Sequence, residues 1–193
     1  MLIVCEGEKT ERKYLRALCT DLGLSSASAI ITPSHRGSDP KSVVIYAIDR
    51  YREDAVRYDR VYCVFDRDTH ASFNEAMALA ESSTLARKGM LGVALSVPCF
   101  EFRVLLHFEF SPAPFASAGG RSPCDQVLEV IMRHFAGDAK STDGLYDHLK
   151  PLTDQTLAHA DRIEEENRRS GSINPSTGFH KPARYLRELA TKG

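Results

Sequence analysis

The sequence has no long run of apolar residues and no excess of charge of one sign, and each absence excludes a class of protein. No uninterrupted apolar stretch approaches the roughly 20 residues that a membrane-spanning helix needs. Lysine and arginine (25) nearly balance aspartate and glutamate (26), so the formal net charge is −1. Proteins that coat nucleic acid by bulk charge usually carry a strongly basic domain. The composition therefore argues against a membrane protein and against a charge-driven nucleic-acid coat.

Cysteine is scarce, and its spacing matches no known framework. The five cysteines are odd in number and show no C-x-x-C pair, so neither a disulfide framework nor a zinc ribbon is predicted. Met1 leads directly into an apolar segment, without the basic region and cleavage site of a secretory signal. We therefore expect a cytoplasmic protein with reduced, mostly buried cysteines, namely Cys5, Cys19, Cys63, Cys99 and Cys124.

A nucleotide-binding loop is also missing, because no segment fits the pattern G-x-x-x-x-G-K-[ST]. Any dependence on ATP must then come from a partner. At 193 residues the chain is long enough for one well-buried α/β domain with an appendage.

The first half of the sequence alternates short apolar runs with segments of helical periodicity. Strands are expected at residues 2–5, 29–32, 60–65 and 90–97, and helices at 10–22, after Ser38-Asp39-Pro40, and at 73–87. Strands that alternate with helices favour a parallel sheet covered by helices on both faces. The fold class is therefore α/β, and a flavodoxin-like strand order 2-1-3-4 is compatible with it.

Helices dominate after Pro98. They are expected at 100–108, 123–135, 144–149, 153–170 and about 182–191, with an aperiodic loop at 111–122. We interpret residues 1–110 as a catalytic core and residues 111–193 as a helical extension packed on it.

Carboxylates follow three of the predicted strands. Glu6 and Glu8 come after the first strand, Asp66 and Asp68 after the third, and Glu101 opens the helix after the fourth. The order 2-1-3-4 would bring these positions to one edge of the sheet, where open parallel sheets bind ligands. Clustered carboxylates repel one another unless a cation such as Mg2+ is bound. One acidic residue after a strand is often a helix cap, but three such positions together predict a metal site.

Basic residues and histidines near these strand ends are candidates for further roles. Lys9 follows the first strand and Arg36 the second, and both are candidates for phosphate contact, with charge balance for the carboxylates as the alternative. The same two interpretations apply to Arg67. His70 and His107 are possible bases, but a histidine on an apolar helix, as at residue 107, is more often part of the core.

Two of these motifs together resemble a known fold family. A strand ending in Glu-Gly, followed 60 residues later by a hydrophobic strand and Asp-x-Asp, resembles the Toprim domain of topoisomerases, DnaG-type primases and OLD-family nucleases. The string Leu2-Ile3-Val4-Cys5-Glu6-Gly7-Glu8-Lys9-Thr10-Glu11 resembles the opening of RloB-like proteins. Later segments agree with it: Gly37-Ser38-Asp39-Pro40, Pro98-Cys99-Phe100-Glu101-Phe102, Leu105-Leu106-His107-Phe108 and Asn174-Pro175-Ser176-Thr177. The resemblance implies a Toprim-like (Rossmann-like) core.

RloB-like proteins, which include AbiLii-type antiphage proteins, are similar to Toprim nucleases and are typically encoded beside an ABC-type AAA ATPase. The resemblance implies general acid/base catalysis by Glu6, metal binding by Asp66 and Asp68 together with Glu6 and Glu101, and helper roles for Glu8 and Lys9. It also implies Mg2+ or Mn2+ as cofactor, DNA or RNA as substrate, and a companion ATPase. No separate domain supplies the nucleophilic tyrosine of a topoisomerase, so we expect hydrolysis by water.

Two other functions share features with this sequence. A haloacid-dehalogenase-type phosphatase also ends a strand with Asp-x-Asp, but it places Thr or Val two positions later, where this chain has His70, and usually uses the first strand. The other alternative is a non-catalytic Toprim-like subunit that binds or regulates an ATPase complex. Glu6, Asp66 and Asp68 favour catalysis, and this alternative stays open.

Overall fold

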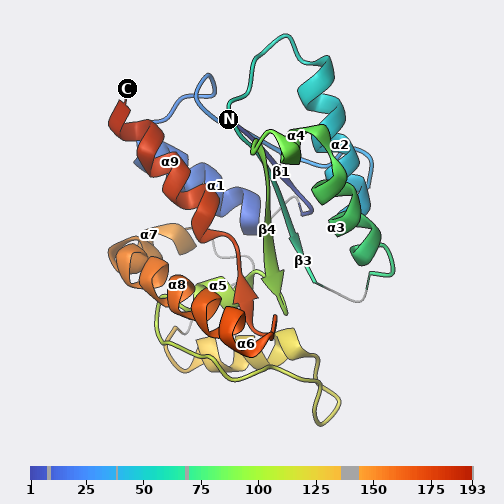
Figure 1. Ribbon diagram of the computed structural model, residues 1–193. Helices are drawn as coiled ribbons and strands as arrows, with labels where there is room; N and C mark the ends of the chain where they lie inside the picture. The colour runs from blue at the N-terminus through green and yellow to red at the C-terminus, as the bar shows by residue number, and fades with distance from the viewer. Residues whose placement is uncertain (8–9, 38, 68–69, 136–143, 193) are drawn as a thin grey trace. The chain divides into compact units, whose positions relative to one another are not determined.

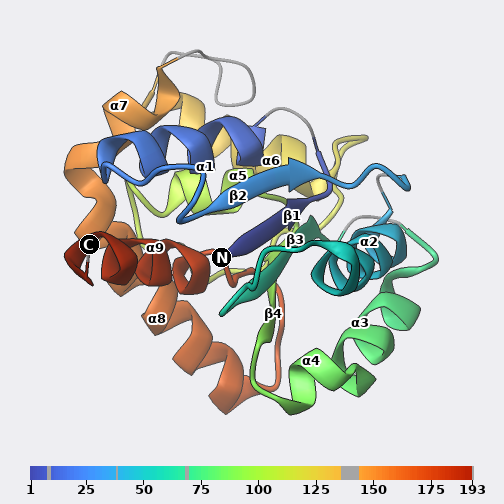
Figure 2. The ribbon, with the colours of Figure 1, turned by 90° about the horizontal axis from the view of Figure 1, so that it is seen from above.

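The computed structural model describes residues 1–7, 10–37, 39–67, 70–135 and 144–192. It contains a five-stranded sheet in the order β2-β1-β3-β4-β5; Figure 1 labels β1, β3 and β4, and Figure 2 also labels β2. The strands are β1 (Leu2–Cys5), β2 (Ile30–Pro33), β3 (Val61–Asp66), β4 (Leu91–Val97) and β5 (Ser176–Thr177). β1 pairs in parallel with β2 and β3, whereas β4 and β5 pair with each other in antiparallel orientation. The α/β class and the order 2-1-3-4 are confirmed, and β5 is an additional edge strand that was not predicted.

The helices of the described residues lie close to the predicted positions. They are α1 (Thr10–Asp21), α2 (Pro40–Glu53), α3 (Phe73–Ser82), α4 (Thr84–Arg87), α5 (Glu101–Leu105), α6 (Pro123–Met132), α7 (Leu145–Leu149), the 3-10 turn η1 (Lys150–Leu152), α8 (Thr153–Ser170) and α9 (His180–Lys192). No helix among these residues is both long and apolar enough to cross a membrane.

Three helices differ from the prediction. The helix expected at 73–87 is two helices, because the Ser83 side chain accepts a hydrogen bond from Ala86 N–H and starts α4. The helix expected at 100–108 ends at Leu105 and continues as turns. α9 starts before Pro182, which lies in its first turn, where a backbone N–H has no partner within the helix.

Contacts divide the chain into two compact units. The first unit comprises Met1–Phe65, Thr69–Leu95 and Lys181–Gly193, and the second comprises Asp66–Asp68 and Ser96–His180. β3 and β4 therefore each run from the first unit into the second. The expected boundary between a core of residues 1–110 and an extension of residues 111–193 stays a prediction.

β1 is the buried centre of the first unit. Its four residues are inaccessible to solvent, and Leu2 and Val4 pack in one cluster with residues of α2 and α3. Successive side chains of a strand point to opposite faces, so Ile3 and Cys5 face the other side, where α1 lies in Figure 2. Burial on both faces explains why this strand is a continuous apolar run.

α5 has the corresponding place in the second unit. All five of its residues are buried, including the charged Glu101 and Arg103, and it contacts α6 and β5. The guanidinium of Arg103 lies 4.6 Å from the centre of the Phe179 ring, a cation–π contact inside this core. The short helix is therefore a core element, although two of its residues are charged.

Gly92 on β4 lies against the ring of Tyr62 on β3, which generates a test of the packing. A Cβ at residue 92 would lie 2.7 Å from Cε1 and 2.9 Å from Cδ1 of Tyr62. We expect Gly92→Ala to lower the free energy of unfolding by about 1–3 kcal/mol through overpacking, measured by urea denaturation. The same substitution should cost much less in a Tyr62→Ala background. An equal cost in both backgrounds would contradict the ring contact as the cause.

Candidate metal and catalytic site

Glu6 directly follows β1 and is anchored by its backbone. Its N–H donates a 2.9 Å hydrogen bond to the carbonyl oxygen of Val64 on β3. The side chain is only 15% exposed, and its Oε1 lies 3.1 Å from Nε2 of His70. The contact with the imidazole orients the carboxylate. A carboxylate in a defined position can act as a general acid or base, which must lie within reach of the group whose proton it transfers. Glu6 and His70 were both candidates on the sequence alone, but the sequence did not predict that they contact each other.

The carboxylate of Asp39 links the segment around His70 to the start of α2. Asp39 caps α2 by accepting hydrogen bonds from the N–H groups of Lys41 (3.1 Å) and Ser42 (3.2 Å). It also accepts a 2.9 Å bond from the hydroxyl of Ser72, two residues after His70. Hydrogen bonding by Ser42, with a further contribution from Ser72, lowers the pKa of Asp39 below its usual value. The ionised carboxylate thus ties the start of α2 to the segment before α3.

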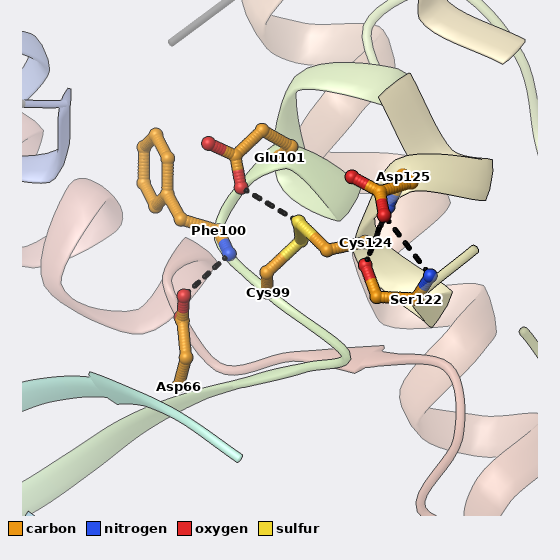
Figure 3. The surroundings of a disulfide bond; sticks show 7 residues. All are labelled: Asp66, Cys99, Phe100, Glu101, Ser122, Cys124 and Asp125. Atoms are coloured by element: carbon orange, nitrogen blue, oxygen red, sulfur yellow. Dashed lines mark hydrogen bonds between the residues drawn. A yellow bond between two sulfur atoms is a disulfide. The ribbon is translucent and has the colours of Figure 1, made fainter. Parts of the chain in front are cut away.

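Asp66 ends β3, and its carboxylate is oriented by the segment after β4. Oδ2 accepts a 3.1 Å hydrogen bond from Phe100 N–H (Figure 3), and Oδ1 is shielded from solvent. The N–H of the next residue, Arg67, donates a 2.8 Å bond to the carbonyl oxygen of Ser96, and the Arg67 side chain is exposed. The predicted metal ligand therefore sits in a structured environment. Asp68, Glu8 and Lys9 lie outside the described residues, so their roles stay predictions.

Glu101, the further carboxylate expected in the metal site, contacts sulfur. It is the first residue of α5 and is 6% exposed. Its Oε2 lies 3.4 Å from Sγ of Cys124, which forms a disulfide with Cys99 (Figure 3). A disulfide sulfur carries no hydrogen, so this contact is not a hydrogen bond. At least one oxygen of Glu101 therefore faces the sulfur pair.

The disulfide shows that the expectation of five reduced cysteines was wrong for two of them. Cys99 and Cys124 are separated by 25 residues, and their Cα atoms lie 5.9 Å apart, a distance that a disulfide spans. Packing of α5 on α6 brings them together, and no spacing rule reports such a contact. The other three, Cys5, Cys19 and Cys63, are free and buried as expected.

Arg36, the predicted phosphate contact after β2, forms an ion pair with α2. Its Nη2 lies 3.0 Å from Oδ2 of Asp49, and the arginine side chain is 54% exposed. Ion pairs this exposed contribute little energy, so a phosphate could replace the aspartate at small cost. Asp49 is not one of the carboxylates expected at the strand ends, so both interpretations of Arg36, phosphate contact and charge balance for those carboxylates, stay predictions.

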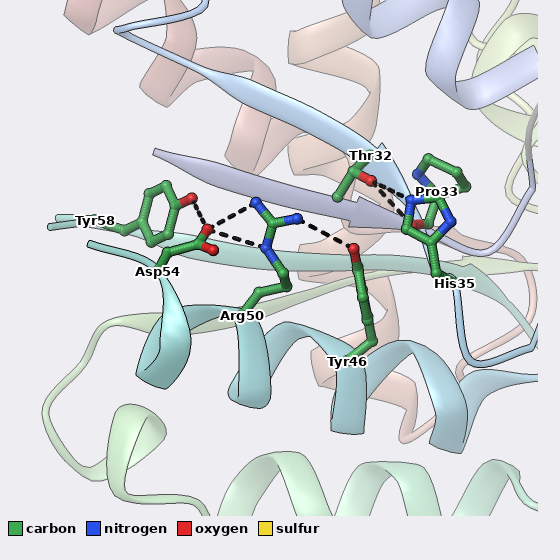
Figure 4. Close-up of polar contacts among 7 residues, drawn as sticks. All are labelled: Thr32, Pro33, His35, Tyr46, Arg50, Asp54 and Tyr58. Carbon is green, nitrogen blue, oxygen red and sulfur yellow. Dashed lines mark hydrogen bonds and ion pairs between the residues drawn. The ribbon is translucent and has the colours of Figure 1, made fainter. Parts of the chain in front are cut away.

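A chain of polar contacts runs along α2 and the residues that follow it (Figure 4). Arg50 donates to Oδ2 of Asp54 at 2.7 Å and 3.0 Å and to the hydroxyl of Tyr46 at 3.3 Å, and Tyr58 donates to the same carboxylate oxygen. The ring of Tyr46 meets the ring of His35 edge-on at 5.4 Å. These contacts hold the turn that carries residue 36 against α2.

His107 is part of the core rather than a catalytic base. It is fully buried, and its Nδ1 lies 3.0 Å from the carbonyl oxygen of Arg103 and 3.2 Å from that of Val104. Burial, with the nearby charge of Arg103, lowers the pKa of His107 to about 3. The imidazole is therefore neutral near pH 7.

Comparison with known proteins gives a match over most of the chain. The family model described as RloB-like protein matches residues 1–184. No curated protein and no solved structure matches the chain.

The buried His107 predicts a specific acid sensitivity. Its pKa falls from the usual 6.5 to about 3 in the folded protein, so only the unfolded chain gains this proton between those values. Stability should be present above pH 6.5 and fall as the pH is lowered toward 3, by up to about 1.4 kcal/mol per pH unit. We expect His107→Gln to lose less stability than the wild type between about pH 7 and pH 4.5 in urea denaturation.

The exposed histidine His134 provides the control for this measurement. His134→Gln should keep the pH dependence of the wild type. If His107→Gln also keeps it, the buried imidazole is not the source of the acid sensitivity.

Proposed function

Because this chain belongs to the family of RloB-like proteins, we propose that it is a metal-dependent Toprim nuclease that hydrolyses the phosphodiester bonds of nucleic acid. The parallel pairing of β1 with β3 carries this proposal. Glu6 follows the first of these strands, and Asp66 ends the second. A glutamate and an Asp-x-Asp pair at the carboxyl ends of paired parallel strands are the arrangement that the Toprim resemblance implies.

The donor set suits a hard divalent cation. Asp66 and Asp68 would hold Mg2+ or Mn2+ through carboxylate oxygens, the ligand type that these ions prefer. When bound, such an ion polarises a phosphodiester and balances the negative charge that develops on its oxygens. Phe100 N–H orients the Asp66 carboxylate through Oδ2. We give Glu101 no part in this site, since its Oε2 contacts Cys124.

Glu6 is the group assigned to proton transfer. Its backbone is held by β3 and its Oε1 contacts His70, so its position is defined from two directions. In this assignment Glu6 takes a proton from the attacking water or gives one to the leaving oxygen. His70 acts through Glu6, as a positioning residue. Whether the three carboxylates share a single cation stays a prediction.

The biological role follows from the family and from what the sequence lacks. The resemblance to RloB-like proteins implies a companion ATPase, and this sequence has no nucleotide-binding loop of its own. We therefore assign the chain as the effector of an antiphage, abortive-infection type of system that a companion ATPase controls. The helical region of residues 111–193 is the part proposed to dock the ATPase.

Substitution of the proposed acids tests the chemistry. Glu6→Gln should lower metal-dependent cleavage by about 10²- to 10⁴-fold, the usual contribution of a general acid or base. Asp66→Asn and Asp68→Asn should abolish it, since they remove charge from the cation ligands. Cleavage is measured on a panel of DNA and RNA substrates with Mg2+, in the presence of the companion ATPase, with a chelator as blank.

Asp59→Asn, at an exposed position, is the matched control and should keep full activity. Thermal melts without metal should show all variants folded. Wild-type activity in Asp66→Asn would contradict the assignment. Binding of the ATPase without cleavage of any substrate would favour the non-catalytic subunit.

The partner assignment predicts a conditional activity. A nuclease that acts on cellular nucleic acid is toxic unless restrained, and the chain has a formal charge of only −1, with no strong basic excess to hold substrate. We expect weak or no cleavage by the purified chain, and metal-dependent cleavage when the triggered ATPase is added. Strong cleavage by the chain alone, with phage resistance unchanged after deletion of the ATPase gene, would refute control by this partner.

A further inference from the structure

The disulfide of the second unit is part of a group of three potential metal ligands. One ligand atom from each of Cys99, Glu101 and Cys124 lies within 4.8 Å of the others. Cys99 and Glu101 are 7% and 6% exposed, and Cys124 is partly buried. Figure 3 shows the carboxylate of Glu101 directed at the sulfur pair. The phosphodiester chemistry proposed above uses none of these three side chains.

In the oxidised protein the contact between Glu101 and Cys124 is not a hydrogen bond. Oε2 lies 3.4 Å from a sulfur that has no hydrogen to donate, in a place shielded from water. Reduction changes this, because each sulfur then becomes a thiol or a thiolate. Two thiolates beside a carboxylate would in turn repel one another unless a cation joined them.

We propose that in the reduced protein Cys99, Glu101 and Cys124 form a binding site for a thiolate-preferring divalent cation, represented by Zn2+. A dithiol reductant first converts the disulfide into two thiols and is itself oxidised to a disulfide. Zn2+ then replaces the two thiol protons, which are released to solvent. A tetrahedral site with two cysteines and one carboxylate leaves a fourth position for water.

The geometry of the three side chains fits such a site. Zn–S bonds of about 2.3 Å place two sulfurs of a tetrahedral site about 3.8 Å apart. This separation is inside the 4.8 Å limit that the ligand atoms already meet. The Cα atoms of the two cysteines are 5.9 Å apart, so rotation of the side chains can open the sulfur pair while the backbone stays in place.

The local backbone also favours a thiolate at Cys124. This residue is the second of α6, a ten-residue helix that opens with Pro123. Ser122 and Asp125 form a capping box, in which Asp125 N–H donates 3.1 Å to the Ser122 hydroxyl and Ser122 N–H donates 3.0 Å to the Asp125 carboxylate. The helix terminus is thus well defined, and its positive end stabilises negative charge on a cysteine in the first turn.

The site would couple the redox state of the chain to metal binding, because a disulfide and a Zn2+ ion need the same sulfurs. Phe100, which lies between two of the ligands in sequence, donates its N–H to Asp66. In the disulfide and in the proposed Zn2+-bound state alike, Cys99 is linked to Cys124 beside the segment that orients Asp66. The proposal does not depend on nuclease activity.

Titration of the reduced full-length chain with Co2+ tests the proposal. Co2+ is a spectroscopic substitute for Zn2+, and bound thiolates give it a charge-transfer absorption that a carboxylate site does not. The signal therefore separates this site from the one proposed at Asp66 and Asp68. We expect one equivalent of Co2+ to produce the band, Zn2+ to remove it, and the oxidised chain to show none.

Three variants make the test specific. Cys124→Ser should lose the band, and Glu101→Gln should keep a weaker band with an affinity lower by at least about 10-fold. Cys19→Ser, which changes a free buried cysteine outside the group, should behave like the wild type. Loss of the band in Cys19→Ser would mean that other thiols bind the metal, which would overturn the assignment.

Protection from alkylation gives a second readout on the unmodified sequence, so the test does not depend on whether the variants fold. In the reduced protein, Zn2+ should slow alkylation of Cys99 and Cys124 at least about 10-fold by mass spectrometry, since a metal-bound thiolate is a weak nucleophile. Equal alkylation with and without Zn2+, or the absence of a thiolate band in the reduced chain, would refute the site.

Discussion

The hydrogen-bonded pairing of β1 with strands on both of its sides is the constraint on which the rest of the first unit depends. Its four residues are excluded from solvent, so its polar backbone groups need partners in the ladder. The register sets Cys5 opposite Pro33 of β2 and Val64 of β3. This register positions the residues that directly follow each strand. Glu6 is held by Val64, and the turn that carries Arg36 begins one residue after Ser34, whose N–H donates to Cys5.

The second unit has a different feature in its core, a short helix whose charged residues are buried. α5 carries Glu101 and Arg103 into the core, and each is placed against a specific neighbour, the Cys124 sulfur and the Phe179 ring. Buried charges are costly unless their surroundings compensate them. Both charged residues come shortly after Phe100, whose N–H donates to Asp66. This placement fits a part of the molecule kept for chemistry rather than for stability alone.

Much of the fold was predictable because local patterns agreed with the tertiary structure. The apolar run of residues 2–5 predicted β1, and the segment Ser38-Asp39-Pro40 predicted the start of α2. β5 was missed because two residues paired with β4 carry no periodicity. The break at Ser83 was missed because a serine between two helical segments reads as part of one helix when the sequence alone is considered. In both cases the missing information is a long-range or capping contact.

The candidate site shows the same limit more sharply. Carboxylates after strands were visible as Glu6 and Asp66, because strand ends can be read from apolar runs. The contact of Glu6 with His70 and the bond from Phe100 to Asp66 depend on loops whose paths have no sequence signature. The disulfide of Cys99 and Cys124 is the clearest case. The spacing of the cysteines predicted free thiols, whereas the packing of α5 on α6 brings these two cysteines within bonding distance.

A crystal of the protein soaked in Mn2+ and measured for anomalous scattering tests the central claim most directly. The account predicts an anomalous peak at ligand distance, about 2.0–2.6 Å, from a carboxylate oxygen of Asp66. The peak should disappear in crystals of Asp66→Asn. A soaked crystal with no anomalous peak at Asp66, or with Mn2+ bound only elsewhere, would contradict the assignment of this strand end as the metal site of a nuclease.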